Sequence, residues 1–268
     1  MGEKGNKKRD KQAKNSASSQ KTAANPIASE TIALLQRLQV SPHYKTSPSQ
    51  RRRLENALSS AYYIPNCMDF QQSKKTGTKT PVGSNPRIVL FKGGSLEAAE
   101  WASQHLTSRQ PQQQNLPDQW FKPVVLDFAS DSCPGGGWRG KQQGTQEEAI
   151  CRLSSLGLSL EHLSTSSFSI PSAGCVYVPD VVVMRQSKAE WKETSFWCAV
   201  IAAALRNSDN SEWILSKVRG IINVASGNGH GALVGGAWGC GAFGNDAETL
   251  ANAWRIAAKA MWSLGLWS

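Results

Sequence analysis

The chain has 268 residues, of which 40% are hydrophobic and 19% are charged, and its formal net charge is +10. This composition excludes collagen, coiled-coil and wholly disordered proteins, and the length predicts one or two domains. The longest apolar run, residues 196–205, is too short for a membrane-spanning helix, which needs about 20 residues.

The positive charge lies in the first third of the chain. Residues 1–92 contain 17 Lys and Arg against 5 Asp and Glu, whereas residues 93–268 contain 13 against 15. Residues 1–28 are polar and rich in lysine, so we expect a disordered basic tail, followed by one folded domain over residues 29–268. Because the tail lacks the apolar core of a secretory signal, we expect an intracellular protein, either nuclear or cytoplasmic. The tail is the part expected to bind nucleic acid directly, and a purely solubilising tail is an equal alternative.

Helical and strand patterns then follow in chain order. Ser29 resembles an N-cap for a helix over residues 29–38, a second helix is predicted over 49–62, and residues 64–86 read as a long loop. Strand patterns follow at 88–91, 124–128, 176–178, 181–184, 196–201 and 232–235. Helical patterns lie between and after them at 95–106, 146–156, 213–225 and 247–262, the first capped by Ser95. This alternation indicates an α/β layer fold with helices on both faces of the sheet.

A glycine-rich loop, residues 131–145, follows the strand at 124–128. Its successive glycines Gly135, Gly136 and Gly137 permit positive φ angles and bring backbone N–H groups close to an anion. Loops of this length are often functional, so we favour a binding loop over a flexible surface loop. Residues 135–141 match the phosphate-loop pattern G-x-x-x-x-G-K, but Gln142 stands where Ser or Thr would hold magnesium. A nucleoside triphosphatase is therefore disfavoured.

Glu147 and Glu148 lie in the first turn of the helix after this loop. Carboxylates are common there because the helix dipole stabilises them, so a purely structural role is an alternative. Adjacent helical residues point about 100° apart, so one glutamate could hold a substrate hydroxyl while the other transfers protons. The helix dipole lowers the pKa of a carboxylate, whereas a general acid needs a raised pKa, so burial or bound substrate would have to oppose the dipole.

A second glycine-rich loop, residues 235–245, follows the strand at 232–235 and opens into the last helix. A strand, a glycine loop and a helix N-terminus together form a geometry that binds phosphate. Phe243 within this loop could stack on a sugar or a base. Two such loops at the carboxyl ends of strands predict a ligand with a phosphate group and a second moiety.

These residues carry a family resemblance. Residues 135–137, an eight-residue spacer and residues 146–148 resemble the GGG-x(6–8)-QEE signature of poly(ADP-ribose) glycohydrolases. The segments that resemble the microbial-type branch of this family, a macrodomain variant, are 126–129, 151–156, 177–181 and, almost residue for residue, 236–245. The resemblance extends over about residues 29–262.

The resemblance implies a macrodomain-like three-layer α/β/α sandwich with a mixed sheet and an N-terminal helical extension. It implies hydrolysis of ribose–ribose O-glycosidic bonds in poly(ADP-ribose), with Glu148 as general acid/base and Glu147 binding ribose. The substrate-binding residues implied are Asp127, Gly135, Gly136, Gly137, Gln146, Gly239, Cys240, Gly241, Ala242, Phe243 and Asn245. No metal or other cofactor is implied. A catalytically weak module that only reads ADP-ribose is the alternative.

The expected partners are poly(ADP-ribose) or ADP-ribosylated proteins, and we expect a monomer without membrane association. The sequence departs from the family pattern at four places. Asp127 stands where the family usually has Asn, Gly94 stands where macrodomains often have an Asp that reads adenine, and Gly157 replaces a usual Tyr. Relatives usually have a strand after the last helix, and we expect that sheet position to be empty or filled differently in this chain. The changes at Asp127 and Gly94 bear on the affinity for ADP-ribose, and the missing strand bears on the stability of the fold.

Overall fold

A computed structural model of the chain describes residues 24–70, 87–108, 116–140, 144–163, 168–186 and 189–263. Most of the predicted basic tail and most of the predicted 64–86 loop lie outside these residues. The part of the tail that is described belongs to the folded domain. Ala28, for example, is 1% exposed and packs in the core.

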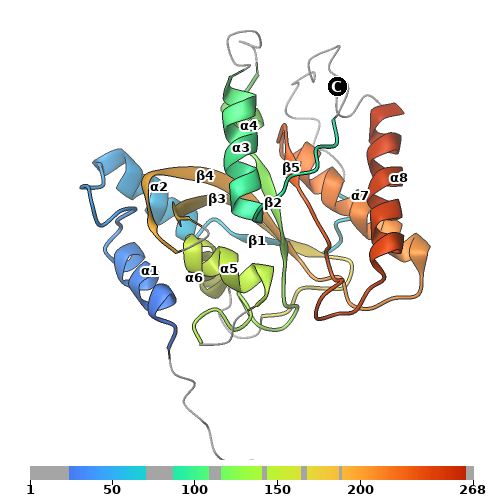
Figure 1. The fold of residues 1–268 in the computed structure, drawn as a ribbon, viewed down its shortest axis with the longest axis horizontal. Coiled ribbons are helices and arrows are strands. Elements are labelled where there is room, and N and C mark those ends of the chain that lie inside the picture. The colour runs from blue at the N-terminus through green and yellow to red at the C-terminus, as the bar shows by residue number, and fades with distance from the viewer. Residues whose placement is uncertain are drawn as a thin grey trace, which may run out of the picture.

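A mixed sheet with the strand order β1-β3-β4-β2-β5 forms the centre of the molecule (Figure 1). The strands are β1 (Tyr62–Ile64), β2 (Val124–Phe128), β3 (Cys175–Arg185), β4 (Trp191–Ala203) and β5 (Leu233–Val234). Strand β2 runs parallel to both β4 and β5, whereas β3 is antiparallel to β1 and β4. The carboxyl ends of β2, β4 and β5 therefore meet at one edge of the sheet.

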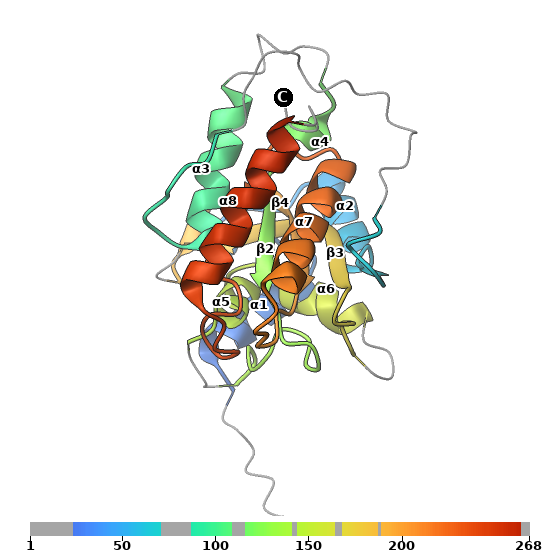
Figure 2. The ribbon, with the colours of Figure 1, turned by 90° about the vertical axis from the view of Figure 1, so that its right-hand side faces the viewer.

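Helices cover both faces of this sheet (Figures 1 and 2). The helices are α1 (Pro26–Gln36), α2 (Pro48–Leu58), α3 (Ser95–Thr107), α4 (Asp118–Phe121), α5 (Gln146–Leu153), α6 (Leu156–Leu163), α7 (Ser211–Gly227) and α8 (Ala247–Ser263). Helices α7 and α8 share one apolar cluster with the sheet, while α1, α3, α5 and α6 share another on the opposite face. A third cluster packs α1 and α2 against the far end of β3. The expected three-layer α/β/α arrangement is confirmed.

Strand β2 shows why its residues form a central strand. Val125 and Leu126 point to opposite faces, and both are fully buried because helices cover both sides. The predicted range 124–128 agrees with β2 as observed. The predicted helix at 95–106 is also confirmed as α3, although its N-cap is Gly94 and not Ser95.

The predicted strand at 88–91 is wrong. These residues form no strand, and Leu90 is 96% exposed. A short apolar run specifies a strand only when a neighbouring strand pairs with it. Instead, Tyr62–Ile64 forms edge strand β1 at the end of the segment predicted to be helical, since the second helix already ends at Leu58.

The first predicted helix begins earlier than expected. Asn25, and not Ser29, is its N-cap, and the Asn25 side chain accepts a hydrogen bond from Ala28 N–H at 3.2 Å. Pro26 follows at the first helical position, where a missing N–H group costs nothing. The helix therefore includes three residues that composition assigned to the tail.

The helix predicted over 146–156 is two helices. The Ser154 hydroxyl donates to Ile150 O at 2.7 Å and accepts from Leu156 N–H at 3.2 Å, so the chain bends between α5 and α6. The strands predicted at 176–178 and 181–184 are, conversely, one strand. Pro179 and Asp180 form an irregularity in the middle of β3, where proline can donate no ladder hydrogen bond.

Candidate active site

The two glycine-rich loops flank the carboxyl end of β2. The first follows β2 directly and leads into α5, and the second connects β5 to α8. A side chain at Gly236 would place its Cβ 3.0 Å from Phe128 Cζ, so the second loop begins against the last residue of β2. The loop after β4 contacts both glycine-rich loops. Arg206 forms an ion pair with Asp131 of the first loop, and the Asn207 side chain donates to Gly244 O of the second at 2.9 Å. The sheet edge thus brings together the two loops that the sequence singled out.

The glycine turn, residues 135–140, requires glycine at Gly135 and Gly136 for two reasons. Gly135 and Gly136 have φ angles of 72° and 57°, in the left-handed region. A Cβ at Gly136 would also lie 3.0 Å from Glu147 Oε2, and one at Gly135 would lie 2.6 Å from Trp138 Cδ1. The backbone of the turn therefore lies directly on the glutamate and the indole ring.

Glu147 is 2% exposed and is held by the chain that leaves β2. Its Oε2 accepts a hydrogen bond from Ser130 N–H at 2.8 Å. Its Oε1 is buried and has no hydrogen-bond partner among the described residues. Burial and the nearby Asp127 carboxyl raise the pKa of Glu147 well above its ordinary value. The site therefore favours a protonated Glu147.

Glu148 is 5% exposed and lies against the glycine turn. Its backbone N–H donates to the N-cap hydroxyl of Thr145 at 3.2 Å, which places it in the first turn of α5. Its Oε1 accepts from Gly137 N–H at 3.1 Å. Its Oε2 lies 3.7 Å from Arg152 Nη2 and, within the described part of the chain, accepts no hydrogen bond. Oε1 of Glu148 is therefore held by a hydrogen bond, whereas Oε2 can still accept one from a ligand.

Arg152 connects α5 to the backbone of the glycine turn. Its Nε donates to Trp138 O at 2.9 Å, and its Nη2 donates to Gly140 O at 3.1 Å and, more weakly, to Gly137 O at 3.4 Å. The residue is 7% exposed, so this buried cation ties the glycine turn to α5. The sequence reasoning assigned Arg152 no task. Its spacing of four residues from Glu148 on a helix could have indicated the ion pair.

Asp127 is completely buried on β2. Neither of its carboxyl oxygens has a hydrogen-bond partner among the residues that the structure describes. Burial raises the pKa of Asp127 well above its ordinary value. Asp127 of β2 and Glu147 of α5 are thus both buried, and the Asp127 charge is one cause of the raised pKa of Glu147.

The Gln146 side chain takes the place of a neighbouring strand along the last part of β2. Strand β5 pairs with only Val124 and Val125, and the Gln146 amide satisfies the backbone further along β2. Its Oε1 accepts from Phe128 N–H at 2.8 Å, while its Nε2 donates to Leu126 O at 2.8 Å and to Ser95 Oγ at 3.1 Å. Both amide hydrogens are therefore bonded to protein groups, and Gln146 anchors the start of α5 on β2. The sequence reasoning placed it in the substrate site and missed this anchoring.

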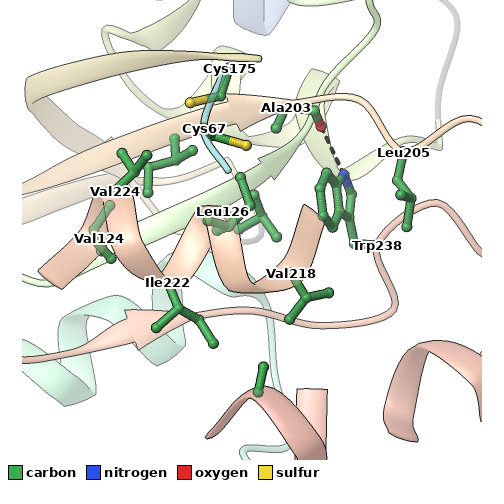
Figure 3. Packing of buried hydrophobic residues seen from close by; sticks show 14 of the residues in the cluster. Cys67, Val124, Leu126, Cys175, Ala203, Leu205, Val218, Ile222, Val224 and Trp238 are labelled. Carbon is green, nitrogen blue, oxygen red and sulfur yellow. Dashed lines mark hydrogen bonds between the residues drawn. The ribbon is translucent and has the colours of Figure 1, made fainter. Parts of the chain in front are cut away.

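The second loop has a rigid base. Trp238 is 0% exposed, and its indole N–H donates to Ala203 O at 2.8 Å, as Figure 3 shows. Asn245 is also buried, and its Nδ2 donates to Leu205 O at 2.8 Å and to Gly239 O at 3.1 Å. Gly239, with a φ of 75°, leaves no room for a side chain between these groups. Asn245 and Gly239 thus fix this loop to the end of β4.

The tip of the second loop is more open than its base. Gly241 and Ala242 are exposed, and Cys240 and Phe243 are partly exposed. A Cβ at Gly241 would meet no atom within 4 Å. Of the residues predicted in this loop, 240–243 are therefore accessible to a ligand, whereas Gly239 and Asn245 support them from below.

Within the described residues, no group of three or more His, Cys, Asp or Glu side chains is arranged to hold a metal ion. The same part of the chain contains no helix long and apolar enough to cross a membrane.

Comparison with known proteins gives the family. Residues 28–186, more than half of the chain, match the family model for the microbial-type PARG catalytic domain. Poly(ADP-ribose) glycohydrolase (PARG) from Thermomonospora curvata is 24% identical, with 85% of this chain and 84% of that chain covered and a TM-score of 0.64. The same enzyme bound to the inhibitor ADP-HPD is 25% identical, covers 85% and 83%, and has a TM-score of 0.62.

No curated protein sequence matches the chain. The solved relatives are bacterial and give no support to the nuclear location considered from the basic tail. The match to the family model agrees with the resemblance carried by the glycine turn and the adjacent glutamates. The chain belongs to the family of microbial-type PARG catalytic domains.

Proposed function

We propose that this protein hydrolyses the ribose–ribose O-glycosidic bonds of poly(ADP-ribose) and releases ADP-ribose. The observation that carries the proposal is the pair Glu147 and Glu148, buried against the glycine turn, each with one carboxyl oxygen lacking a hydrogen-bond partner among the described residues. Buried polar groups are normally satisfied, so such oxygens suggest a polar ligand. The match to the PARG family model and the inhibitor-bound Thermomonospora curvata enzyme support the choice of ligand.

In this proposal Glu148 is the general acid and base. Gly137 N–H holds Oε1, so Oε2 is the oxygen that transfers the proton. The protonated carboxyl gives its proton to the departing glycosidic oxygen as the C–O bond breaks, which leaves an oxocarbenium-like ribose. The resulting carboxylate then accepts a proton from the water molecule that attacks this carbon. Each cycle consumes one water molecule and returns Glu148 to its starting state.

The remaining groups bind and orient the substrate. Glu147 binds a ribose hydroxyl through its Oε1, since Oε2 is held by Ser130 N–H. The exposed backbone of Gly241 and Ala242 offers N–H groups to the diphosphate, and Phe243 packs on the distal ribose. The Asn245 clamp keeps this loop in one conformation, which lowers the entropic cost of binding.

The test is release of ADP-ribose from purified poly(ADP-ribose) by the parent and by Glu148→Gln. The amide retains the shape of the side chain but cannot exchange the proton, so we expect a loss of about 10²–10⁴-fold in rate. The variant should still bind ADP-ribose. The matched control is Glu212→Gln, which changes an exposed glutamate in the first turn of α7.

A module that only reads ADP-ribose is the competing function. It requires that the folded parent binds ADP-ribose but releases none from the polymer, with or without the Glu148→Gln change. That result would overturn the hydrolase proposal. Equal release by the parent and Glu148→Gln would instead remove Glu148 from its role as acid and base.

A further inference from the structure

Arg206 is an exposed cation in the loop after β4, beside both glycine-rich loops. Its side chain is 69% exposed and forms an ion pair with Asp131 of the first loop. The next residue, Asn207, donates from its side chain to Gly244 O of the second loop at 2.9 Å. Arg206 is therefore attached to both of the segments that the proposed function assigns to the substrate.

The residues around Arg206 connect it to the part of the site that is assigned to ribose. The residue before its ion-pair partner is Ser130, whose N–H donates to Glu147 Oε2 at 2.8 Å. On the other side, the carbonyl that accepts from Asn207 belongs to the residue after Phe243. Glu147 and Phe243 are the side chains proposed to contact the ribose at the scissile bond. The Arg206 cation therefore lies next to the ribose end of the proposed site.

The Arg206 guanidinium still has hydrogen-bond donors for a ligand. Its Nε is the group that donates to Asp131 Oδ2, and neither Nη1 nor Nη2 makes a hydrogen bond within the described residues. A guanidinium is planar, so its two Nη groups form a fork that matches two oxygens of one phosphate group. Asp131 thus holds one side of the guanidinium and leaves the fork open to solvent.

The other described arginines on the glycine-rich loops and α5 are already engaged. Arg139 donates from Nε and from Nη2 to the two carboxyl oxygens of Glu161, both at 2.6 Å. Arg152 is 7% exposed and donates to the carbonyls of the glycine turn. Among the arginines described on these segments and the loop after β4, Arg206 is therefore the one that presents a free fork to solvent.

We propose that Arg206 binds a phosphate group of the ADP-ribose unit that lies beyond the scissile bond, and so favours the polymer as substrate. The inference rests on the proposed function. The alcohol that leaves in that reaction belongs to the adjoining unit, and the ribose of this alcohol also carries the diphosphate of that unit. The diphosphate of the bound unit itself is assigned to Gly241 and Ala242, at the tip of the second loop. Arg206 adds a contact that poly(ADP-ribose) can make and free ADP-ribose cannot.

The experiment compares turnover of purified poly(ADP-ribose) with calorimetric binding of free ADP-ribose. In Arg206→Gln we expect the KM for the polymer to rise about three- to tenfold, since a charge-assisted contact in a solvent-exposed place is lost. We expect kcat to stay within about twofold of the parent, because the contact is made equally before and during the reaction. The affinity for free ADP-ribose should be that of the parent. Arg206→Lys keeps the charge but loses the fork, so its KM should lie between those of the parent and Arg206→Gln.

Salt dependence gives a second measurement. One phosphate contact fewer should make the slope of log(kcat/KM) against log salt concentration shallower by about 0.7, the value for one contact on a single strand. The matched control is Arg37→Gln, which removes the same charge at the exposed C-terminal end of α1 and should keep the KM and the slope of the parent.

Three results would overturn the inference and leave the proposed function standing. They are an unchanged KM for the polymer in Arg206→Gln, an equal loss of affinity for free ADP-ribose in that variant, and an equal rise of KM in Arg37→Gln. A folded parent that binds ADP-ribose but releases none from the polymer would overturn the proposed function, and the inference with it.

Discussion

The Arg152 guanidinium lies 3.7 Å from the Glu148 carboxylate, one helical turn away. The same guanidinium donates to the carbonyl oxygens of Trp138 and Gly140, which follow Gly137 in the chain. Gly137 N–H in turn donates to Glu148 at 3.1 Å. One buried cation therefore sets the distance between the glycine turn and the proposed general acid.

Arg152→Lys tests this arrangement. Lysine keeps the charge, but its single ammonium group cannot reach the carbonyls of both Trp138 and Gly140 together with Glu148. We expect at least a tenfold lower rate of ADP-ribose release. We also expect a free energy of unfolding lower by about 2–4 kcal/mol, measured in urea, because buried carbonyls lose their donors. Arg255→Lys, at an exposed position on α8, is the control. Unchanged release and stability in Arg152→Lys would show that the charge alone suffices.

Gly157→Ala tests the packing of Trp138 beneath the glycine turn. A Cβ at position 157 would lie 2.6 Å from Trp138 Cε2 and Cζ2. The ring is 1% exposed and is anchored by a 3.0 Å hydrogen bond from its Nε1 to Glu161, so it cannot easily move aside. A side chain at position 157 therefore has no room while Trp138 keeps this position.

We expect Gly157→Ala to lower the free energy of unfolding by about 1–3 kcal/mol, since overpacking outweighs the better helix propensity of alanine. Urea unfolding followed by tryptophan fluorescence measures the change. Gly241→Ala is the matched control, because its Cβ would meet no atom within 4 Å. Equal stability of the two variants would mean that the indole ring relaxes without cost.

The buried His230 side chain makes the free energy of unfolding depend on pH. The side chain is 3% exposed, its Nδ1–H donates to Lys122 O at 2.8 Å, and its Nε2 accepts from the Tyr177 hydroxyl at 2.8 Å. Burial lowers the pKa of His230 to about 4. The unfolded chain binds a proton near pH 6.5, whereas the folded chain does not. Stability that is present above about pH 6.5 is therefore lost as the pH falls toward about 4.

We expect this loss to amount to about 3 kcal/mol at most, and to be absent in His230→Gln. The measurement is the free energy of unfolding at a series of pH values in this range. His43→Gln, which changes an exposed imidazole, should retain the slope of the parent. A slope that is the same in His230→Gln and in the parent would place the acid sensitivity elsewhere.

Local sequence patterns alone predict several helices and strands correctly. The period of 3.6 residues in Leu96, Ala99, Ala102 and Leu106 predicts α3, because helical hydrogen bonds and side-chain stripes involve only near neighbours. The apolar run at 124–128 predicts β2 for a similar reason. The spacing of three glycines from two glutamates predicts that these residues lie together, as they do, because loop, cap and first turn are continuous in sequence.

Contacts between distant segments decided the rest. Strand β1 exists because Tyr62–Ile64 pairs with β3, more than a hundred residues away, and the more apolar segment 88–91 finds no such pairing. The break between α5 and α6 comes from one serine hydroxyl that redirects the backbone.

The sequence by itself placed Glu147 and Glu148 next to the glycine turn, since they follow it at a recognisable spacing. Only the tertiary structure decided what surrounds these carboxyl groups. Asp127 and Glu147 are buried because helices cover β2 and the start of α5, and Arg152 reaches the glycine turn from α5. The cost of burying a charge depends on everything that surrounds it, and those surroundings come from every layer of the fold.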